Sequence, residues 1–236
     1  MSENLAFSFA LDLMFNGQDM DYCERPISLS PLNMMSFFME MRKNSKVCVI
    51  GPGGGRLVMT LLERGYRVDA YEGRDECYDH INEMFKDDRR VNLYRATRLD
   101  DPTRVEKLKY DAIFCMDDLR AFREEREWTT IVQRMVNRDG YFIYSQVSNQ
   151  LPKKKNHLDK HFDLVASQNV STETATEIKD SYLALSQWEP DPKMGDMAKQ
   201  TLNMVEAGAK LRRNIRSGVE IRYVVWKKKP EPDTDI

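Results

Sequence analysis

A glycine-rich loop is the sequence feature best suited to bind a ligand. Four glycines fill five positions between a short apolar run and a helix-length amphipathic segment, in the order Gly51, Pro52, Gly53, Gly54 and Gly55. Glycines supply no packing side chain, and ordering them on folding costs backbone entropy. The advantage of a glycine-rich loop is that a ligand can approach its main chain closely. We therefore predict that this loop binds a ligand.

The spacing of these glycines distinguishes two classes of nucleotide-binding protein. A dinucleotide-binding fold uses G-x-G-x-x-G, in which the third glycine lets the helix pack closely. Arg56 stands at that third position, whereas Gly51, Gly53 and Gly55 fit G-x-G-x-G. A nicotinamide-dependent oxidoreductase is therefore the last of the candidate functions.

Two acidic residues are candidates for ligand binding or catalysis beside the loop. Glu72 ends the second predicted strand, 21 residues beyond Gly51, where a carboxylate can accept hydrogen bonds from both hydroxyls of a ribose. Asp117 follows the fourth predicted strand and is the candidate catalytic residue, either orienting an amino group or taking a proton from an acceptor. The alternative is a helix cap for the next segment, a role that suits Asp118 better.

Metal sites are not expected. The segment 145–149 after the fifth predicted strand holds no carboxylate, and His157 and His161 lie among lysines that favour a solvated face. The four cysteines form no C-x-x-C pair, which favours free, buried thiols in a cytoplasmic protein.

The elements that must position these residues alternate between short β-branched runs and helical segments, which predicts β-α-β units around a parallel sheet. We predict strands at 47–50, 67–71, 91–94, 111–115, 141–144, 162–170 and 219–226, with a turn at 137–140. The expected organisation is an N-terminal helical or lid segment (1–45), one α/β domain (46–228) with a helical insertion at about 175–216, and a tail (229–236). The first helix docks either on its own domain or on a second subunit in a homodimer.

Charge and composition limit the classes of partner that we expect for this protein. With 36 basic and 38 acidic side chains the net charge is −2, which disfavours a nucleic-acid partner. No apolar stretch reaches the roughly 20 residues of a membrane helix, and no basic region precedes Leu5 in the manner of a signal peptide. A small-molecule acceptor is the expected substrate, with Tyr22 and Trp188 as candidate contacts outside the core.

At these motifs the sequence resembles the class I S-adenosylmethionine-dependent methyltransferases. The resemblance covers 46–145 and rests on three motifs: the loop with its preceding strand (47–55), the segment 68–72 that ends in Glu72, and the segment 110–119. Such proteins have a Rossmann-like, doubly wound, mostly parallel sheet of seven strands whose last strand is antiparallel. The resemblance therefore implies this fold, S-adenosylmethionine as cofactor, and methyl transfer to a small molecule by in-line displacement, a reaction that depends on orientation and desolvation.

The resemblance also assigns cofactor-binding residues. Gly51, Pro52, Gly53 and Gly55 would pass beneath the methionine and ribose, and Glu72 would hold the ribose hydroxyls. Thr97 and Asp117 complete the implied cofactor site, Thr97 being nearest to the family's adenine-binding acidic position. Two departures, Val49 in place of an acidic residue and the missing acid near Thr97, keep two alternatives open: an aminopropyl-type transferase related to polyamine synthases, and a non-catalytic binding or scaffold protein.

Overall fold

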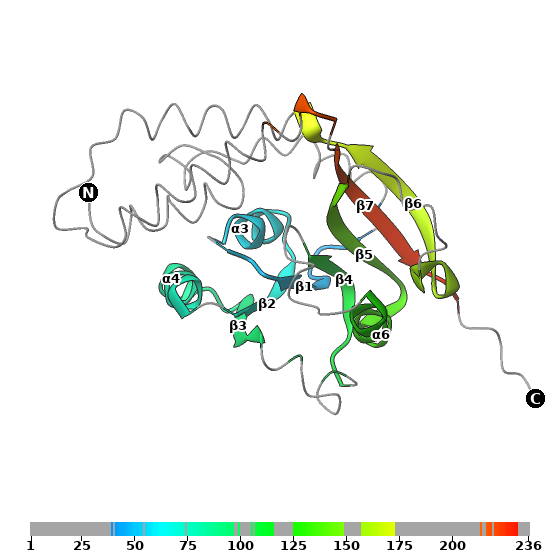
Figure 1. Ribbon diagram of the computed structural model, residues 1–236. Coiled ribbons are helices and arrows are strands. Elements are labelled where there is room, and N and C mark those ends of the chain that lie inside the picture. Colours follow the sequence, from blue (N-terminus) through cyan, green and yellow to red (C-terminus); the bar gives the residue numbers. More distant parts are fainter. Residues whose placement is uncertain are drawn as a thin grey trace, which may run out of the picture.

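A seven-stranded sheet with helices on its faces forms the described part of the chain (Figure 1). The computed structural model describes residues 39, 41–53, 55–73, 75–96, 99, 105, 107–115, 125–148, 157–172, 213, 216–218 and 220–230. The strands are β1 (Lys46–Ile50), β2 (Arg67–Glu72), β3 (Val91–Arg95), β4 (Tyr110–Cys115), β5 (Val136–Ser148), β6 (Phe162–Asn169) and β7 (Glu220–Lys228). The helices are α3 (Arg56–Glu63), α4 (Asp75–Phe85), α6 (Glu125–Met135) and the short 3-10 helix η3 (His157–Lys160).

The strand order β3-β2-β1-β4-β5-β7-β6 confirms the predicted fold class. Strands β1 to β5 pair in parallel, while β7 runs antiparallel to both β5 and β6. The chain leaves β1 toward β2 and β3 on one side and later returns to place β4 on the other side. In open α/β sheets this change of direction opens a crevice at the carboxyl ends of the strands, where ligands bind.

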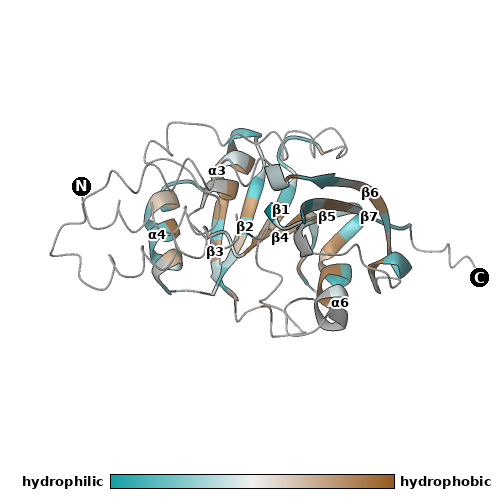
Figure 2. Ribbon diagram, turned by 45° about the horizontal axis from the view of Figure 1, so that its top comes forward, coloured by the Kyte–Doolittle hydropathy of each residue, from teal (hydrophilic) through white to brown (hydrophobic). Residues whose placement is uncertain are grey.

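Both faces of the sheet are covered by apolar packing, as expected for parallel strands. On one face α3 contributes Leu57, Val58 and Leu61 to a core with Val47 and Val49 of β1. The opposite face packs against the side chains of α6 and η3, including Val132, Met135 and Leu158. Figure 2 shows brown, hydrophobic stretches along the strands between these helices.

The predicted turn at 137–140 lies inside β5, which begins at Val136, so the prediction that the strand starts at 141 was wrong. Pairing with β4 shifts register here, from Tyr110↔Val136 to Ala112↔Tyr141. Asp139 has φ 61°, and a Cβ on Gly140 would lie 2.9 Å from the Asp111 carbonyl oxygen. The turn-forming residues therefore produce a bulge within a longer strand.

Two further expectations concern the cysteines and the segments outside the core. Cys48, Cys77 and Cys115 are buried and free, as predicted, and the fourth cysteine, Cys23, lies outside the described residues. The predicted helix of the 1–45 segment, nearly all of the insertion at about 175–216 and most of the tail lie outside the described residues. None of the described helices has the length and hydropathy needed to cross a bilayer.

Candidate functional site

The glycine loop follows β1 and turns into α3 through left-handed backbone. Gly51, Gly53 and Gly55 have φ angles of 67°, 58° and 91°. Residues with a Cβ rarely adopt this region, whereas glycine does so at no steric cost. The three glycines of the G-x-G-x-G pattern are thus the positions where the described loop requires glycine.

Main-chain hydrogen bonds fix the two ends of the loop. The Gly51 N–H donates to the Tyr71 carbonyl of β2 over 2.9 Å, and the Gly55 carbonyl accepts the Met59 N–H of α3 over 3.0 Å. A Cβ added at Gly55 would lie 3.2 Å from the Phe85 ring, so α4 packs closely against the loop. Contacts with β2, α3 and α4 therefore hold the loop in place without a ligand.

Glu72 lies at the carboxyl end of β2 with only 2% of its surface exposed. One carboxylate oxygen, Oε2, accepts the Gly53 N–H over 3.1 Å, and Oε1 accepts the Gly73 N–H over 2.9 Å. The side chain predicted to bind a ligand therefore also holds the middle of the glycine loop. A carboxylate can accept about four hydrogen bonds, so contact with the loop is compatible with contact to a ribose diol.

The described site thus combines three properties at the carboxyl ends of β1 and β2. These are a glycine loop with positive φ angles at the start of a helix, a buried carboxylate bonded to that loop, and a position beside the change in strand direction between β1 and β4. Such an arrangement suits a ligand that carries a ribose with free hydroxyls and passes close to main chain.

Pro52, also predicted for the site, is buried in the loop, where its carbonyl accepts the Gly55 N–H over 3.0 Å. The remaining four predicted residues are outside the described part of the chain. Thr97 comes two residues after the end of β3, and Asp117 comes two residues after Cys115, which ends β4. Tyr22 and Trp188 lie in the segments before β1 and between β6 and β7. Their roles remain predictions.

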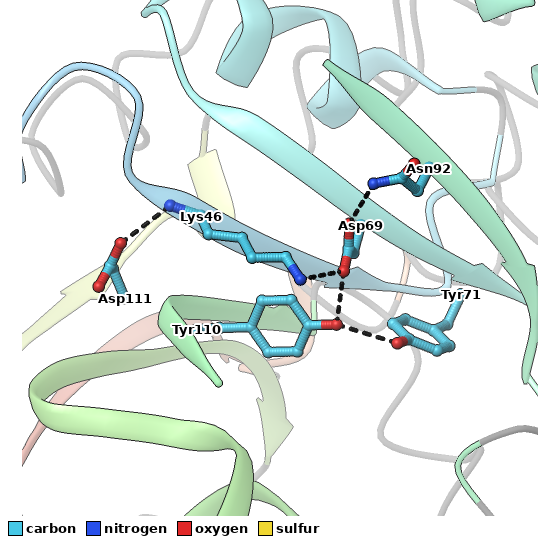
Figure 3. Close-up of polar contacts among 6 residues, drawn as sticks. All are labelled: Lys46, Asp69, Tyr71, Asn92, Tyr110 and Asp111. Atoms are coloured by element: carbon cyan, nitrogen blue, oxygen red, sulfur yellow. Dashed lines mark hydrogen bonds and ion pairs between the residues drawn. The ribbon is translucent and has the colours of Figure 1, made fainter. Parts of the chain in front are cut away.

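A second polar cluster, centred on Asp69 of β2, was not predicted (Figure 3). Asp69 is 2% exposed. Its Oδ2 is 2.8 Å from both Lys46 Nζ and Tyr110 Oη, and its Oδ1 accepts Asn92 Nδ2 over 2.8 Å. A charged residue inside the otherwise apolar run 68–71 was the available signal. The cluster links β1, β2, β3 and β4 within the sheet.

The phenols of this cluster form a chain with a fixed direction. Tyr110 donates its only proton to Asp69, so at the 2.9 Å contact with Tyr71 Oη it must be the acceptor. Burial raises the pKa of both tyrosines, so both keep their protons. Burial, and then the Asp69 charge, raise the pKa of the nearby Cys48 thiol. Lys46 and Tyr110 begin their strands, away from the carboxyl ends, and we therefore assign the cluster a structural role.

No group of three or more His, Cys, Asp or Glu side chains arranged to hold a metal occurs within the described ranges. His161, one of the two histidines noted in the sequence, is in basic surroundings. Partial burial and the charges of Lys160, Lys228 and Lys229 lower its pKa. These lysines would also oppose the binding of a metal cation.

Comparison with known proteins gave matches in structure only. No family model and no curated protein matches the sequence. Among solved structures, the cyclopropane synthase of Mycobacterium tuberculosis has a TM-score of 0.70 at 11% identity, with 97% of this chain and 95% of that one covered. A putative sarcosine dimethylglycine methyltransferase from Galdieria sulphuraria has a TM-score of 0.58 at 13% identity, with coverages of 84% and 82%.

A phosphoethanolamine N-methyltransferase of Haemonchus contortus, solved with phosphomonomethylethanolamine and S-adenosylhomocysteine, has a TM-score of 0.67 at 14% identity. The match covers 95% of this chain but only 57% of the Haemonchus enzyme. These likenesses show that the chain has the fold of the class I S-adenosylmethionine-dependent methyltransferases. Because the same fold serves an N-methyltransferase and a cyclopropane synthase, it does not by itself fix the reaction.

Proposed function

We propose that this protein is an S-adenosylmethionine-dependent methyltransferase that acts on a small-molecule acceptor. The observation that carries the proposal is the bond between Gly53 N–H and the buried Glu72 carboxylate, within a loop where Gly51, Gly53 and Gly55 have positive φ. This arrangement lies where the fold places its ligand crevice. Solved neighbours that contain S-adenosylmethionine or S-adenosylhomocysteine support the choice of cofactor.

The residues present fit such a cofactor. Gly51, Pro52, Gly53 and Gly55 offer main chain without projecting side chains on three of the four positions, and Glu72 offers acceptors for two ribose hydroxyls. When bound, S-adenosylmethionine would supply a methyl group on a positively charged sulfur, a good leaving group for in-line transfer to the acceptor. The protein's part is to orient the two molecules and to exclude water.

The acceptor side of the proposal rests on residues outside the described ranges. Asp117, two residues beyond β4, takes the role of orienting the cofactor's amino group or removing a proton from the acceptor. Thr97 is proposed for the adenine side, and Tyr22 and Trp188 for the acceptor pocket. A near-neutral net charge of −2 supports a small acceptor rather than a polyanion.

Transfer of an aminopropyl group from decarboxylated S-adenosylmethionine is the second candidate. Val49 is the residue that favours aminopropyl transfer, because it replaces the acidic residue usual at this position in the class I methyltransferases. Its side chain is 1% exposed and packs in the core on the α3 side of the sheet. Retention of the fold without catalysis is the third candidate. The first two candidates differ in their ligands, so binding measurements separate them. The third is separated from the first by a test for methylation.

A thermal-shift series tests the proposal. S-adenosylmethionine and S-adenosylhomocysteine should both raise Tm, because a ligand that binds only the folded state stabilises it. Decarboxylated S-adenosylmethionine and NAD should raise it less. A larger shift with the decarboxylated cofactor would favour aminopropyl transfer, and no shift with either of the first two ligands would overturn the proposal. Binding without methylation of any acceptor in a screen would support the scaffold alternative.

Gly53→Val tests the location of the site. Gly53 has φ 58° and donates its N–H to Glu72, so a β-branched side chain there strains the loop at its contact with the carboxylate. We expect calorimetry to show an affinity for S-adenosylhomocysteine lower by at least about tenfold, with native circular dichroism.

Gly65→Val is the matched control. Gly65 also has a positive φ, 83°, but it lies in the turn between α3 and β2, where the three atoms nearest to an added Cβ belong to the Lys43 side chain. Comparable backbone strain should leave the affinity unchanged. Equal affinities for the two variants would place the cofactor elsewhere.

A further inference from the structure

Arg95 occupies a position next to the proposed ribose site that the sequence analysis did not single out. It ends β3 and pairs in register with Glu72, which ends β2. Because paired residues of neighbouring parallel strands lie on the same face, the two side chains share the α3 and α4 side of the sheet. The Arg95 guanidinium lies 3.8 Å from the centre of the Tyr78 ring and contacts the carboxylates of Asp75 and Asp79.

These three partners belong to the start of α4, which begins at Asp75. Their spacing of i, i+3 and i+4 places them on one face of the helix. Only Gly73 and residue 74 connect Glu72 to that helix, and the Gly73 N–H donates to Glu72 Oε1. Glu72 therefore lies at one end of a very short connection between β2 and α4, and Arg95 holds the other end, where α4 begins.

We propose that Arg95 is a positioning residue for cofactor binding: it holds the start of α4 against the end of β3 and so keeps the Glu72 carboxylate oriented for two ribose hydroxyls. The inference rests on the proposed function, and in particular on Glu72 as the ribose acceptor. Arg95 itself need not contact the cofactor. Its effect should appear in how strongly the protein distinguishes ligands with and without these hydroxyls.

The contacts of Arg95 orient the start of α4 and contribute little to the overall stability of the protein. The side chains of Arg95, Asp75 and Asp79 are 42%, 82% and 76% exposed, and ion pairs this exposed contribute little to the free energy of unfolding. A planar guanidinium can nevertheless lie flat against a ring while its N–H groups contact carboxylates, a stacked geometry that an ammonium group cannot reproduce. Removing it should leave the domain folded while loosening the connection.

The test compares S-adenosylhomocysteine with its 2′,3′-dideoxy analogue by calorimetry. Wild-type protein should prefer the ligand with hydroxyls, and Arg95→Met should reduce this preference by about fivefold, the ratio that corresponds to about 1 kcal/mol. Arg95→Lys, which keeps the charge without the planar stack, should recover only part of it. Asp75→Asn, which weakens the same contact from the helix side, should act in the same direction if Arg95→Met fails to fold.

Arg90→Met is the matched control. Arg90 precedes β3 at its opposite end, has a side chain that is 47% exposed, and forms an ion pair with Asp88 over 2.6 Å. It should leave the preference for hydroxyls unchanged.

The outcomes separate the two claims. An equal loss of affinity for both ligands in Arg95→Met, or no change in their ratio, would overturn the positioning role while leaving the proposed function intact. Failure of the wild-type protein to bind S-adenosylhomocysteine would overturn the proposed function and this inference together.

Discussion

Glu72 has a structural role in the fold that does not depend on a bound ligand. Its two oxygens accept the N–H groups of Gly53 and Gly73, and the residue is almost fully buried. Hydrogen bonds to a charged group contribute more than neutral ones, about 1.5–3 kcal/mol each. The carboxylate therefore organises the middle of the glycine loop, so that little ordering is left for the moment of binding.

Glu72→Gln should separate this role from simple packing. The amide keeps one carbonyl acceptor and turns an NH₂ group toward the second main-chain donor. We expect faster hydrogen exchange at the Gly53 amide, and an affinity for S-adenosylhomocysteine lower by roughly ten- to a hundredfold. NMR exchange and calorimetry measure the two effects.

Glu63→Gln, at the exposed end of α3, is the matched control and should change neither quantity. If Glu72→Gln leaves both exchange and affinity at the wild-type values, the carboxylate does not hold the loop.

At the scale of elements, the Asp69 cluster determines how four parallel strands meet. Asp69 of β2 receives donors from Lys46 of β1, Asn92 of β3 and Tyr110 of β4. Buried polar groups are costly when a partner is missing, so a slipped register of any of these strands would be penalised. Asp111 adds a second link, because its Oδ2 accepts the Lys46 main-chain N–H and its Oδ1 accepts Asn137 Nδ2, both over 2.8 Å.

The direction of the phenol chain predicts unequal effects for two similar substitutions. Tyr110→Phe removes a donor from Asp69 and leaves the Tyr71 hydroxyl without its acceptor, so it should lower the free energy of unfolding by about 2 kcal/mol. Tyr71→Phe removes only the last hydroxyl of the chain and should cost about 1 kcal/mol or less. Urea unfolding of the two variants measures the difference. A larger cost for Tyr71→Phe would contradict the assigned direction.

At the scale of the whole molecule, β-α-β units around a parallel sheet could be predicted from local sequence pattern, whereas the antiparallel last strand was implied by the resemblance to the class I methyltransferases. Apolar runs such as 47–50 and 111–115 mark buried parallel strands, and the glycines at 51, 53 and 55 mark a turn with positive φ. These features depend on neighbouring residues alone. The Glu72 position could also be predicted, because its distance from the loop follows from one helix and one strand.

Other features depend on contacts that no local pattern encodes. Asp69 and Tyr110 are 41 residues apart, and their contact requires the register of β2 and β4 across β1. Arg95 meets α4 only because β3 pairs with β2. The bulge at 136–140 arises from the fit of Gly140 against Asp111, which the turn-forming residues alone do not reveal.

The most direct test of the account is hydrogen exchange of the intact protein, read peptide by peptide, with and without S-adenosylhomocysteine. The ligand should slow exchange in the peptides that hold 51–55 and 72–73, because these main-chain groups lie at the proposed site. The amino-terminal half of β4, around Tyr110, should be affected less. Binding that leaves 51–55 and 72–73 unprotected, while protecting another region, would contradict the central claim that the glycine loop and Glu72 form the cofactor site.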